Sequence, residues 1–301
     1  MSSFKAAFKK LIPSVVGIGL RRSADNYQIL GTGFFLSSDG WIVTNRHVLE
    51  AVADFSPNGS IRIKNNATVV MFVQAPPTPE FRSVTGIIAT RVLAVVAPPN
   101  ASIEIAAAAE KIAKGEFVPP KFKGLDPEII HADTLDVGLC QINPKSLPHE
   151  ALPLSPAKIV DSKHVSEGTT IGVMGFPRGL SLNETYSSVS DIQLTPLLQV
   201  GVISGKLPMS GDPNPDRFVL DIMINPGSSG SPVFLEDGSV IGIAHATRIA
   251  FHPLQVLQED GVTESERHGI SIPIGLGLAI PSTKFPEEWL GGKSREKRKR
   301  K

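Results

Sequence analysis

The sequence predicts an all-β protein composed of many short antiparallel strands. Apolar and β-branched runs of strand length recur along the chain, and turns rich in Gly, Pro, Asp and Asn separate most of them. The 27 glycines and 25 prolines also leave room for few long helices. Strands that follow one another at this spacing, without helices between them, are typical of antiparallel barrels or sandwiches rather than of a parallel sheet.

The first 12 residues are expected to form an amphipathic lead-in, and the first β unit starts at residue 13. Its opening strands are the runs VVGIGL, QILGTGFFL and WIVTN. The tetrapeptide from Ser37 to Gly40 separates the last two runs and has the composition of a hairpin turn. This part of the chain is therefore predicted to be a meander of paired strands.

The pattern loosens between about residues 51 and 132, which we interpret as an insertion on the β scaffold. Pro-rich breaks at 75–79 and 97–99 interrupt it. One helix is predicted from Ala101 to Lys114, with Asn100 as its N-cap and Gly115 at its end.

Strand patterns return after the insertion, and a Pro-rich stretch at 143–155 is suited to a linker between two units. The first unit is predicted to cover residues 13–145, the second residues 146–290, and a basic disordered tail residues 291–301. The later strands are TLDVGLCQI, TTIGVMGF, LLQVGVISG, RFVLDIMI, SPVFL, SVIGIAHAT and GLGLAIP.

Charge is unevenly distributed along the chain. The formal net charge is +1, but residues 293–301 hold seven basic side chains and one acidic one, which leaves 23 basic and 28 acidic residues elsewhere. The mildly acidic body excludes a dedicated nucleic-acid binder. The tail is either a solvated terminus or a segment that contacts nucleic acid or an anionic surface.

Cys140 is the only cysteine, so no intrachain disulfide is available. The N-terminus lacks a clean signal peptide, and no apolar run is long enough to span a membrane. These observations predict a cytoplasmic location, or a nuclear one in a eukaryote, where the basic tail would serve as the address.

The sharpest local signal is the run Asn225-Pro226-Gly227-Ser228-Ser229-Gly230-Ser231-Pro232. A serine between glycines in a turn can present its hydroxyl with little side chain around it. The amides of Gly227 and Ser229 could then form an oxyanion hole for acyl transfer. The competing interpretation is an ordinary Gly-Ser turn.

A serine nucleophile needs a base, and the base needs an acceptor for its second ring nitrogen. His47 lies in TNRHV, where a strand ends and a helical turn can start. Asp136 opens the apolar run DVGLC and is costly there unless it is hydrogen-bonded. Asp133 is the rival acid, placed before the apolar run and expected to be more solvated.

These motifs occur in the order His, Asp, Ser, and the chain resembles trypsin-like (chymotrypsin-fold) serine peptidases, most closely the protease domain of the HtrA/Deg family. The resemblance implies two six-stranded antiparallel β-barrels with the active site in the cleft between them, plus the inserted helix-containing segment. The matching stretches, in family order from Gly31 to Pro281, are GTGFFLSSDGWIVTNRHV, LDVGLCQI, VMGFPRGL, QVGVISG, INPGSSGSPVF, SVIGIAHA and GLGLAIP.

The resemblance also assigns roles to residues. It implies His47 as general base, Asp136 as orienting carboxylate and Ser229 as nucleophile, with an oxyanion hole at Gly227, Ser228 and Ser229. Ser231 stands where the family usually has Gly, and Ser228 where it usually has Asn. Both changes are small and should spare the turn.

The resemblance further implies a specificity pocket without a carboxylate, and hence a preference for a medium aliphatic side chain at the cleavage site. Its expected lining is Met223, Ile224, Ile243, Ala244 and His245.

No PDZ-like module is expected after Pro281, and the family's habit makes a homo-oligomer an open expectation. No cofactor is expected. No metal site is expected either, because one cysteine and dispersed histidines show no ligand spacing. The predicted function is a serine endopeptidase that hydrolyses polypeptides through an acyl-enzyme. The alternative is a protease-like binding module with an occluded or inactive cleft.

Overall fold

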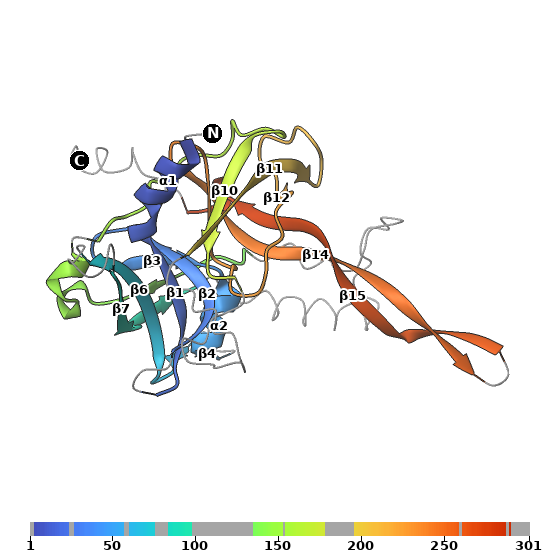
Figure 1. The fold of residues 1–301 in the computed structure, drawn as a ribbon, viewed down its shortest axis with the longest axis horizontal. Helices are drawn as coiled ribbons and strands as arrows, with labels where there is room; N and C mark the ends of the chain where they lie inside the picture. Colours follow the sequence, from blue (N-terminus) through green and yellow to red (C-terminus); the bar gives the residue numbers. More distant parts are fainter. Residues whose placement is uncertain are drawn as a thin grey trace.

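The computed structural model describes residues 3–23, 27–56, 60–75, 84–97, 135–152, 154–177, 196–258, 261–286 and 289. Two β units make up this part of the chain, with a short N-terminal helix lying against the second (Figure 1). The helices are few and short, as the many turns in the sequence predict.

The first unit is a curled sheet of seven antiparallel strands in the order β7-β6-β1-β2-β3-β9-β8. Gly40 closes the β2–β3 hairpin with φ of 91°, and a Cβ there would lie 2.4 Å from the Ile142 carbonyl oxygen. The strands are β1 (Val15–Arg21), β2 (Tyr27–Phe35), β3 (Trp41–Thr44), β6 (Ala67–Ala75), β7 (Val84–Arg91), β8 (Ala94–Val96) and β9 (Gly138–Gln141).

Three of these strands come from the region predicted to be an insertion. The start of β6, from Ala67 to Val70, pairs with β1, so β6 belongs to the sheet itself. Its run TVVMFV is apolar without alternation because Val69 and Val70 pack into different cores, one on each face of the sheet. A continuous apolar run lacks the period of two by which a strand is recognised. The helix predicted at 101–114 lies outside the described residues.

The remaining elements of the first unit are short. Helix α2 follows β3 directly and carries one candidate catalytic residue. A two-stranded ribbon, β4–β5, follows α2. Their bounds are α2 (Arg46–Val52), β4 (Ala53–Phe55), β5 (Ile61–Ile63), and the 3-10 turns η3 (Pro144–Ser146) and η4 (His149–Ala151).

The second unit is a closed six-stranded barrel in the order β10-β11-β12-β15-β14-β13. Its interior holds Phe218, Leu220 and Val173, among others. Strands β14 and β15 stay paired far beyond the barrel and project from the body as a long ribbon (Figure 1). The bounds are β10 (Thr170–Gly175), β11 (Leu197–Leu207), β12 (Arg217–Leu220), β13 (Pro232–Phe234), β14 (Val240–Gln258), β15 (Gly261–Pro281) and η5 (Ser282–Lys284).

A shared core joins the two units and the N-terminal helix α1 (Ser3–Leu11), which leads through η1 (Ile12–Ser14) into β1. Ala7 and Leu11 of α1 are buried, and the ring of Phe4 lies 6.0 Å from that of Phe234 in β13. The lead-in is thus a helix whose apolar side packs on the second barrel.

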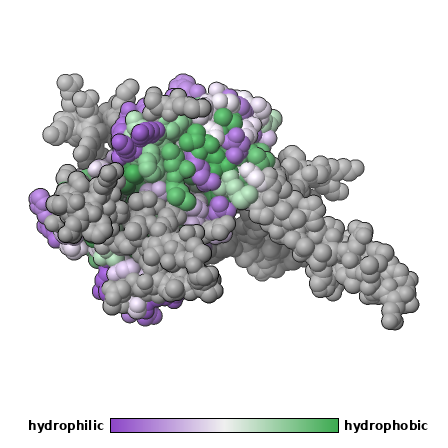
Figure 2. Space-filling view, viewed as in Figure 1, coloured by the Kyte–Doolittle hydropathy of each residue, from purple (hydrophilic) through white to green (hydrophobic). Residues whose placement is uncertain are grey.

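The surface around β10 and β11 is markedly hydrophobic (Figure 2). On β11, Leu197 and Val200 are 48% and 50% exposed. In the described part of the chain, no helix has both the length and the apolar character to cross a membrane.

The predicted all-β fold of two barrel-like units is confirmed. The first unit differs in detail, since its described strands form an open seven-stranded sheet instead of a closed barrel of six. The boundaries proposed for the units and for the tail remain predictions.

Candidate active site

His47 is the second residue of helix α2, which starts one residue after β3 ends. Asn45 connects the two elements in an extended conformation, and its side-chain amide donates to the Asp136 carbonyl at 2.8 Å. Gly138 lets the helix come close to β9, because a Cβ there would lie 2.6 Å from Leu49 Cδ1. The local sequence therefore places the imidazole next to the segment that precedes β9.

Asp136 binds both the backbone and the ring of His47. Its Oδ1 accepts the His47 amide at 2.9 Å, and its Oδ2 lies 2.6 Å from His47 Nδ1. The first contact satisfies one of the unpaired amides at the start of a helix. Together they fix the ring's orientation and place the proton on Nδ1, which leaves Nε2 as the free acceptor. The rival Asp133 lies outside the described residues.

A second imidazole reaches the same carboxylate. His245 Nδ1 lies 2.7 Å from Asp136 Oδ2, and the rings of His47 and His245 are 6.0 Å apart at 65°. Burial is the largest influence and by itself would raise the pKa of Asp136. The hydrogen bonds from His245 and His47 and the attraction of the two imidazoles outweigh it, so the pKa of Asp136 is lowered.

The turn that carries Ser229 is anchored to the first sheet. Ser228 N donates to the Asn225 carbonyl at 2.9 Å, and Gly227 has φ of 89°, which with Pro226 before it defines a type II turn. Thr32 in β2 donates its hydroxyl to the Gly227 carbonyl at 2.7 Å, and its amide donates to the Ser229 carbonyl at 2.8 Å. These bonds tie the turn to the neighbouring unit.

Close packing also requires a glycine after the serine. Gly230 has φ of 89°, and a Cβ there would lie 1.9 Å from the Thr32 carbonyl oxygen. Among the described residues, the amides of Gly227 and Ser229 have no hydrogen-bond acceptor. Two donors on one turn beside a hydroxyl can stabilise an oxyanion when substrate is bound.

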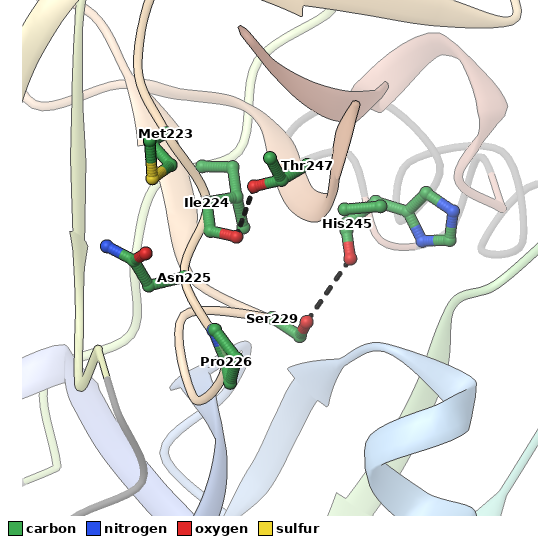
Figure 3. A pocket seen from close by; sticks show the side chains of 8 residues that line it. Met223, Ile224, Asn225, Pro226, Ser229, His245 and Thr247 are labelled. Atoms are coloured by element: carbon green, nitrogen blue, oxygen red, sulfur yellow. Dashed lines mark hydrogen bonds between the residues drawn. The ribbon is translucent and has the colours of Figure 1, made fainter. Parts of the chain in front are cut away.

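The Ser229 hydroxyl is directed at the main-chain carbonyl of His245, at 3.2 Å (Figure 3). Figure 3 also shows the His245 ring pointing away from Ser229. No hydrogen bond joins Ser229 Oγ to His47 in the described part of the molecule. His245 thus contacts both halves of the site, through its ring and through its carbonyl.

A cavity of about 370 Å³ opens beside Ser229. Of the predicted pocket residues, Met223, Ile224 and His245 line it, whereas Ile243 and Ala244 are fully buried in the core. The other lining residues are Asn225, Pro226, Ser229, Ala246 and Thr247.

The sequence did not predict the contact between His245 and Asp136. These two residues are 109 positions apart in the chain. The register of β14 on β15 shifts between Ala244 and Ala246, and such a bulge redirects the side chain at its centre. The available signal was a histidine that directly follows the apolar run from Val240 to Ala244, since a half-buried polar ring needs a partner.

Cys140 lies in β9 and is fully buried, and burial raises the pKa of its thiol to about 12. A thiol that stays protonated is a poor nucleophile. This leaves Ser229 as the nucleophile candidate in the described part of the chain.

Several known proteases are similar to this chain. The probable periplasmic serine endoprotease DegP-like of Halomonas elongata is 24% identical over 226 residues, which is 75% of this chain and 31% of that protein. The Chlamydia pneumoniae protein of the same description is 25% identical over 256 residues, or 84% of this chain and 32% of that one. The chain therefore spans about a third of the length of these relatives.

Solved structures of proteases are also similar. The serine endoprotease from Yersinia pestis gives a TM-score of 0.47 at 17% identity and covers 95% of this chain and 66% of its own. The HtrA-type protease AlgW with decapeptide gives 0.46 at 17% identity, with 93% and 64% covered.

The relatives correct the predicted location. They are described as periplasmic, which contradicts the expectation of a cytoplasmic or nuclear protein. That expectation rested partly on the lone Cys140, and a single cysteine cannot form an intrachain disulfide in any compartment. The cysteine count therefore carried no information about redox environment.

A family model describes the same region as the motifs. The trypsin-like peptidase domain matches residues 31–243, a stretch that contains His47, Asp136 and Ser229. The match covers more than half of the chain, from β2 to the barrel strand beside the nucleophile turn. This protein therefore belongs to the trypsin-like peptidase family.

Proposed function

We propose that the chain is a serine endopeptidase in which Ser229 is the nucleophile, His47 the general base and Asp136 the orienting acid. The observation that carries the proposal is the double contact of Asp136 with the amide and ring of His47, at 2.9 and 2.6 Å. A carboxylate that holds the imidazole in one tautomer is what a serine nucleophile requires of its base.

The reaction follows from these positions. His47 Nε2 takes the hydroxyl proton of Ser229 as the oxygen attacks the substrate carbonyl carbon. The resulting oxyanion is stabilised by the Gly227 and Ser229 amides. The tetrahedral intermediate then collapses, and His47 gives the proton to the leaving amine. Water repeats the sequence on the acyl-enzyme and releases the acid product, while Asp136 remains ionised throughout.

One rotation precedes the attack. Ser229 must exchange its bond to the His245 carbonyl for one to His47. A single hydrogen bond between neutral groups contributes about 0.5–1.5 kcal/mol net, so exchanging one for another costs little free energy. Substrate entering the cavity beside Ser229 would favour it.

The cavity supports the aliphatic preference expected from the sequence. Met223 and Ile224 line it, and none of its lining residues carries a carboxylate that could pair with Lys or Arg. We therefore propose cleavage after medium aliphatic residues. A panel of peptides that differ only at this position tests the preference, and fastest cleavage after Arg or Lys would refute it.

Labelling with a fluorophosphonate probe tests the nucleophile directly. The wild-type chain should form one adduct at Ser229, located by mass spectrometry, and Ser229→Ala should form none. Ser231→Ala is the matched control, because the buried Ser231 Oγ has no hydrogen-bond partner among the described residues and its removal should leave Ser229 in place. Degradation of an unfolded polypeptide, followed with the same three proteins, tests the activity.

The bond from Ser229 to the His245 carbonyl favours one alternative, a protease-like binding module whose cleft stays inactive. A folded wild-type protein that gives no adduct and leaves unfolded polypeptide intact would establish that alternative and refute the enzyme.

A further inference from the structure

Two histidines and one carboxylate converge at the edge of the site. Asp136 Oδ2 lies 2.6 Å from His47 Nδ1 and 2.7 Å from His245 Nδ1. One ligand atom from each of the three residues can be chosen so that all lie within 4.8 Å of one another. They come from α2, from the segment before β9 and from the bulge in β14, which explains why no spacing in the sequence revealed them.

The proposed reaction uses only one of the two imidazoles. His47 needs one acceptor at Nδ1, and Asp136 supplies it. His245 adds a second donor to the same oxygen without a role in the proton transfers. Two nitrogen donors on one carboxylate oxygen are also a donor set that suits a metal ion.

We propose that His47, Asp136 and His245 bind a zinc ion, and that zinc reversibly inhibits the enzyme. Two imidazoles and a carboxylate are ligands that zinc uses with a fourth position left for water. The side chains are 45%, 13% and 25% exposed, respectively, so an ion can enter from solvent.

Only a small adjustment is needed. Ligands about 2.0–2.1 Å from a tetrahedral ion lie about 3.3 Å from one another. The two nitrogen-to-oxygen distances of 2.6 and 2.7 Å must therefore lengthen by less than about 1 Å. Each neutral imidazole moves its single ring proton from Nδ1 to Nε2 through solvent, which frees Nδ1 for the ion and leaves the charge and proton count of both rings unchanged.

The donor set also selects the ion. Mg²⁺ and Ca²⁺ prefer six or more oxygen ligands, which these residues do not provide. Imidazole nitrogens favour zinc and its neighbours among the transition metals. The negative carboxylate of Asp136, only 13% exposed, gains a cation in place of two hydrogen-bond donors.

Inhibition follows from the tautomer. With zinc on Nδ1, the His47 proton resides on Nε2, which can no longer accept the proton of Ser229. The Asp136 oxygen that would stabilise the imidazolium is occupied as well. This consequence rests on the proposed function, whereas the binding of zinc does not.

Calorimetric titration of the chelator-treated full chain with ZnCl₂ tests the binding. One zinc per chain should bind to the wild type. His245→Gln should lower the affinity by more than about 10-fold, the loss that even changes outside the ligand set produce. The matched control is His164→Gln, at an exposed histidine outside the cluster, which should bind as the wild type does.

A second variant guards against misfolding. His47→Gln should also lose zinc affinity, and circular dichroism of all variants checks the fold. Co²⁺ used as a probe should give a visible absorption spectrum in the wild type and in His164→Gln, absent in His245→Gln and abolished by zinc.

Hydrolysis of a fluorogenic peptide tests inhibition. Each protein is compared with its own metal-free rate. Zinc should stop the wild type and His164→Gln, EDTA should restore them, and the same zinc concentration should lower the rate of His245→Gln far less. Equal zinc affinity in folded wild type and His245→Gln, or no stoichiometric binding, overturns the site. Binding to an inactive wild type would refute the proposed function alone, and activity indifferent to bound zinc would refute the inhibition.

Discussion

The two units of the molecule contribute unequal halves to the site. From the first unit, His47 on α2 and Asp136 before β9 are bonded to each other through amide and ring, at 2.9 and 2.6 Å. From the second barrel, Ser229 has a fixed backbone, but its hydroxyl bonds to the His245 carbonyl. The proposed base is already held by its acid, whereas the proposed nucleophile is positioned by its turn and its hydroxyl must still change partner. The comparison shows that the fold fixes the side chains of His47 and Asp136, whereas at Ser229 it fixes the backbone and leaves the hydroxyl to rotate.

The largest expected effect on hydrolysis comes from replacing Ser229, which the second barrel contributes to the candidate site. Ser229→Ala should reduce hydrolysis by about a millionfold, the loss seen when an activated serine is removed. Steady-state hydrolysis of a fluorogenic peptide measures it. Ser231→Ala should stay within a few fold of the wild type. Substantial activity in the Ser229 variant would show that the nucleophile lies elsewhere.

The next largest effect is expected from replacing Asp136, which the first unit contributes to the candidate site. Asp136→Asn should lower kcat by about 10⁴-fold, because an amide favours the wrong tautomer of His47. The measurement is kcat for the same peptide, with Asp161→Asn as an exposed control that should leave it unchanged. If kcat fell less than about 10-fold, a different carboxylate would have to orient the base.

The contact between the halves gives a smaller effect. Thr32→Val removes the hydroxyl that donates to the Gly227 carbonyl and should cost about 1–3 kcal/mol of unfolding free energy. Hydrolysis should fall as well, by about 10-fold or more, because the oxyanion turn loses its anchor. Urea unfolding and kcat measure the two effects.

Thr68→Val is the control for that experiment. Its buried hydroxyl donates to the Thr90 carbonyl at 3.0 Å between β6 and β7, so stability should fall while kcat does not. A parallel loss of kcat in both variants would mean that activity follows overall stability and that the Thr32 contact has no special role.

The smallest effect is expected from replacing Asp237, which lies in the second unit and is not one of the candidate site residues. The amide and hydroxyl of Ser239 bond to Asp237 and lower its pKa. A lowered pKa stabilises the fold above the unfolded-state pKa, and this contribution disappears as pH falls through the folded-state value. Asp237→Asn should cost less than about 1 kcal/mol near pH 7, with a difference from the wild type that narrows in acid and kcat unchanged. Urea unfolding at several pH values measures it, and a difference that grows in acid would contradict the assignment.

Much of the fold could be predicted from strand and turn patterns alone. The hairpin at Ser37 to Gly40 follows from its turn residues, and α2 follows where β3 ends. Strand β6 could not be assigned from the sequence, because its apolar run buries side chains on both faces of the sheet. Such a run lacks the alternation of apolar and polar residues by which a strand is recognised. The helix at 101–114 stays a prediction.

The candidate site, like the fold, could be predicted from the sequence only in part. The motif around Ser229, the position of His47 and the resemblance to a known family were enough to indicate three candidate catalytic residues. The resemblance assigned Ile243 and Ala244 to the pocket, and both side chains lie fully buried in the core. The β-bulge at His245 changes which side chains of β14 face the cavity. The local amino-acid sequence does not reveal such a bulge.

By itself, the sequence determined the turn chemistry of Asn225 to Ser231, the apolar strands and the residue types that acyl transfer needs, because these depend on local preferences and short-range spacing. Only the tertiary structure decided that His245 shares the Asp136 carboxylate with His47, and that Thr32 anchors the turn that carries Ser229. The contacts of His245 with Asp136 and of Thr32 with Gly227 join residues 109 and 195 positions apart. They arise from the packing of two units against each other, which no local pattern encodes.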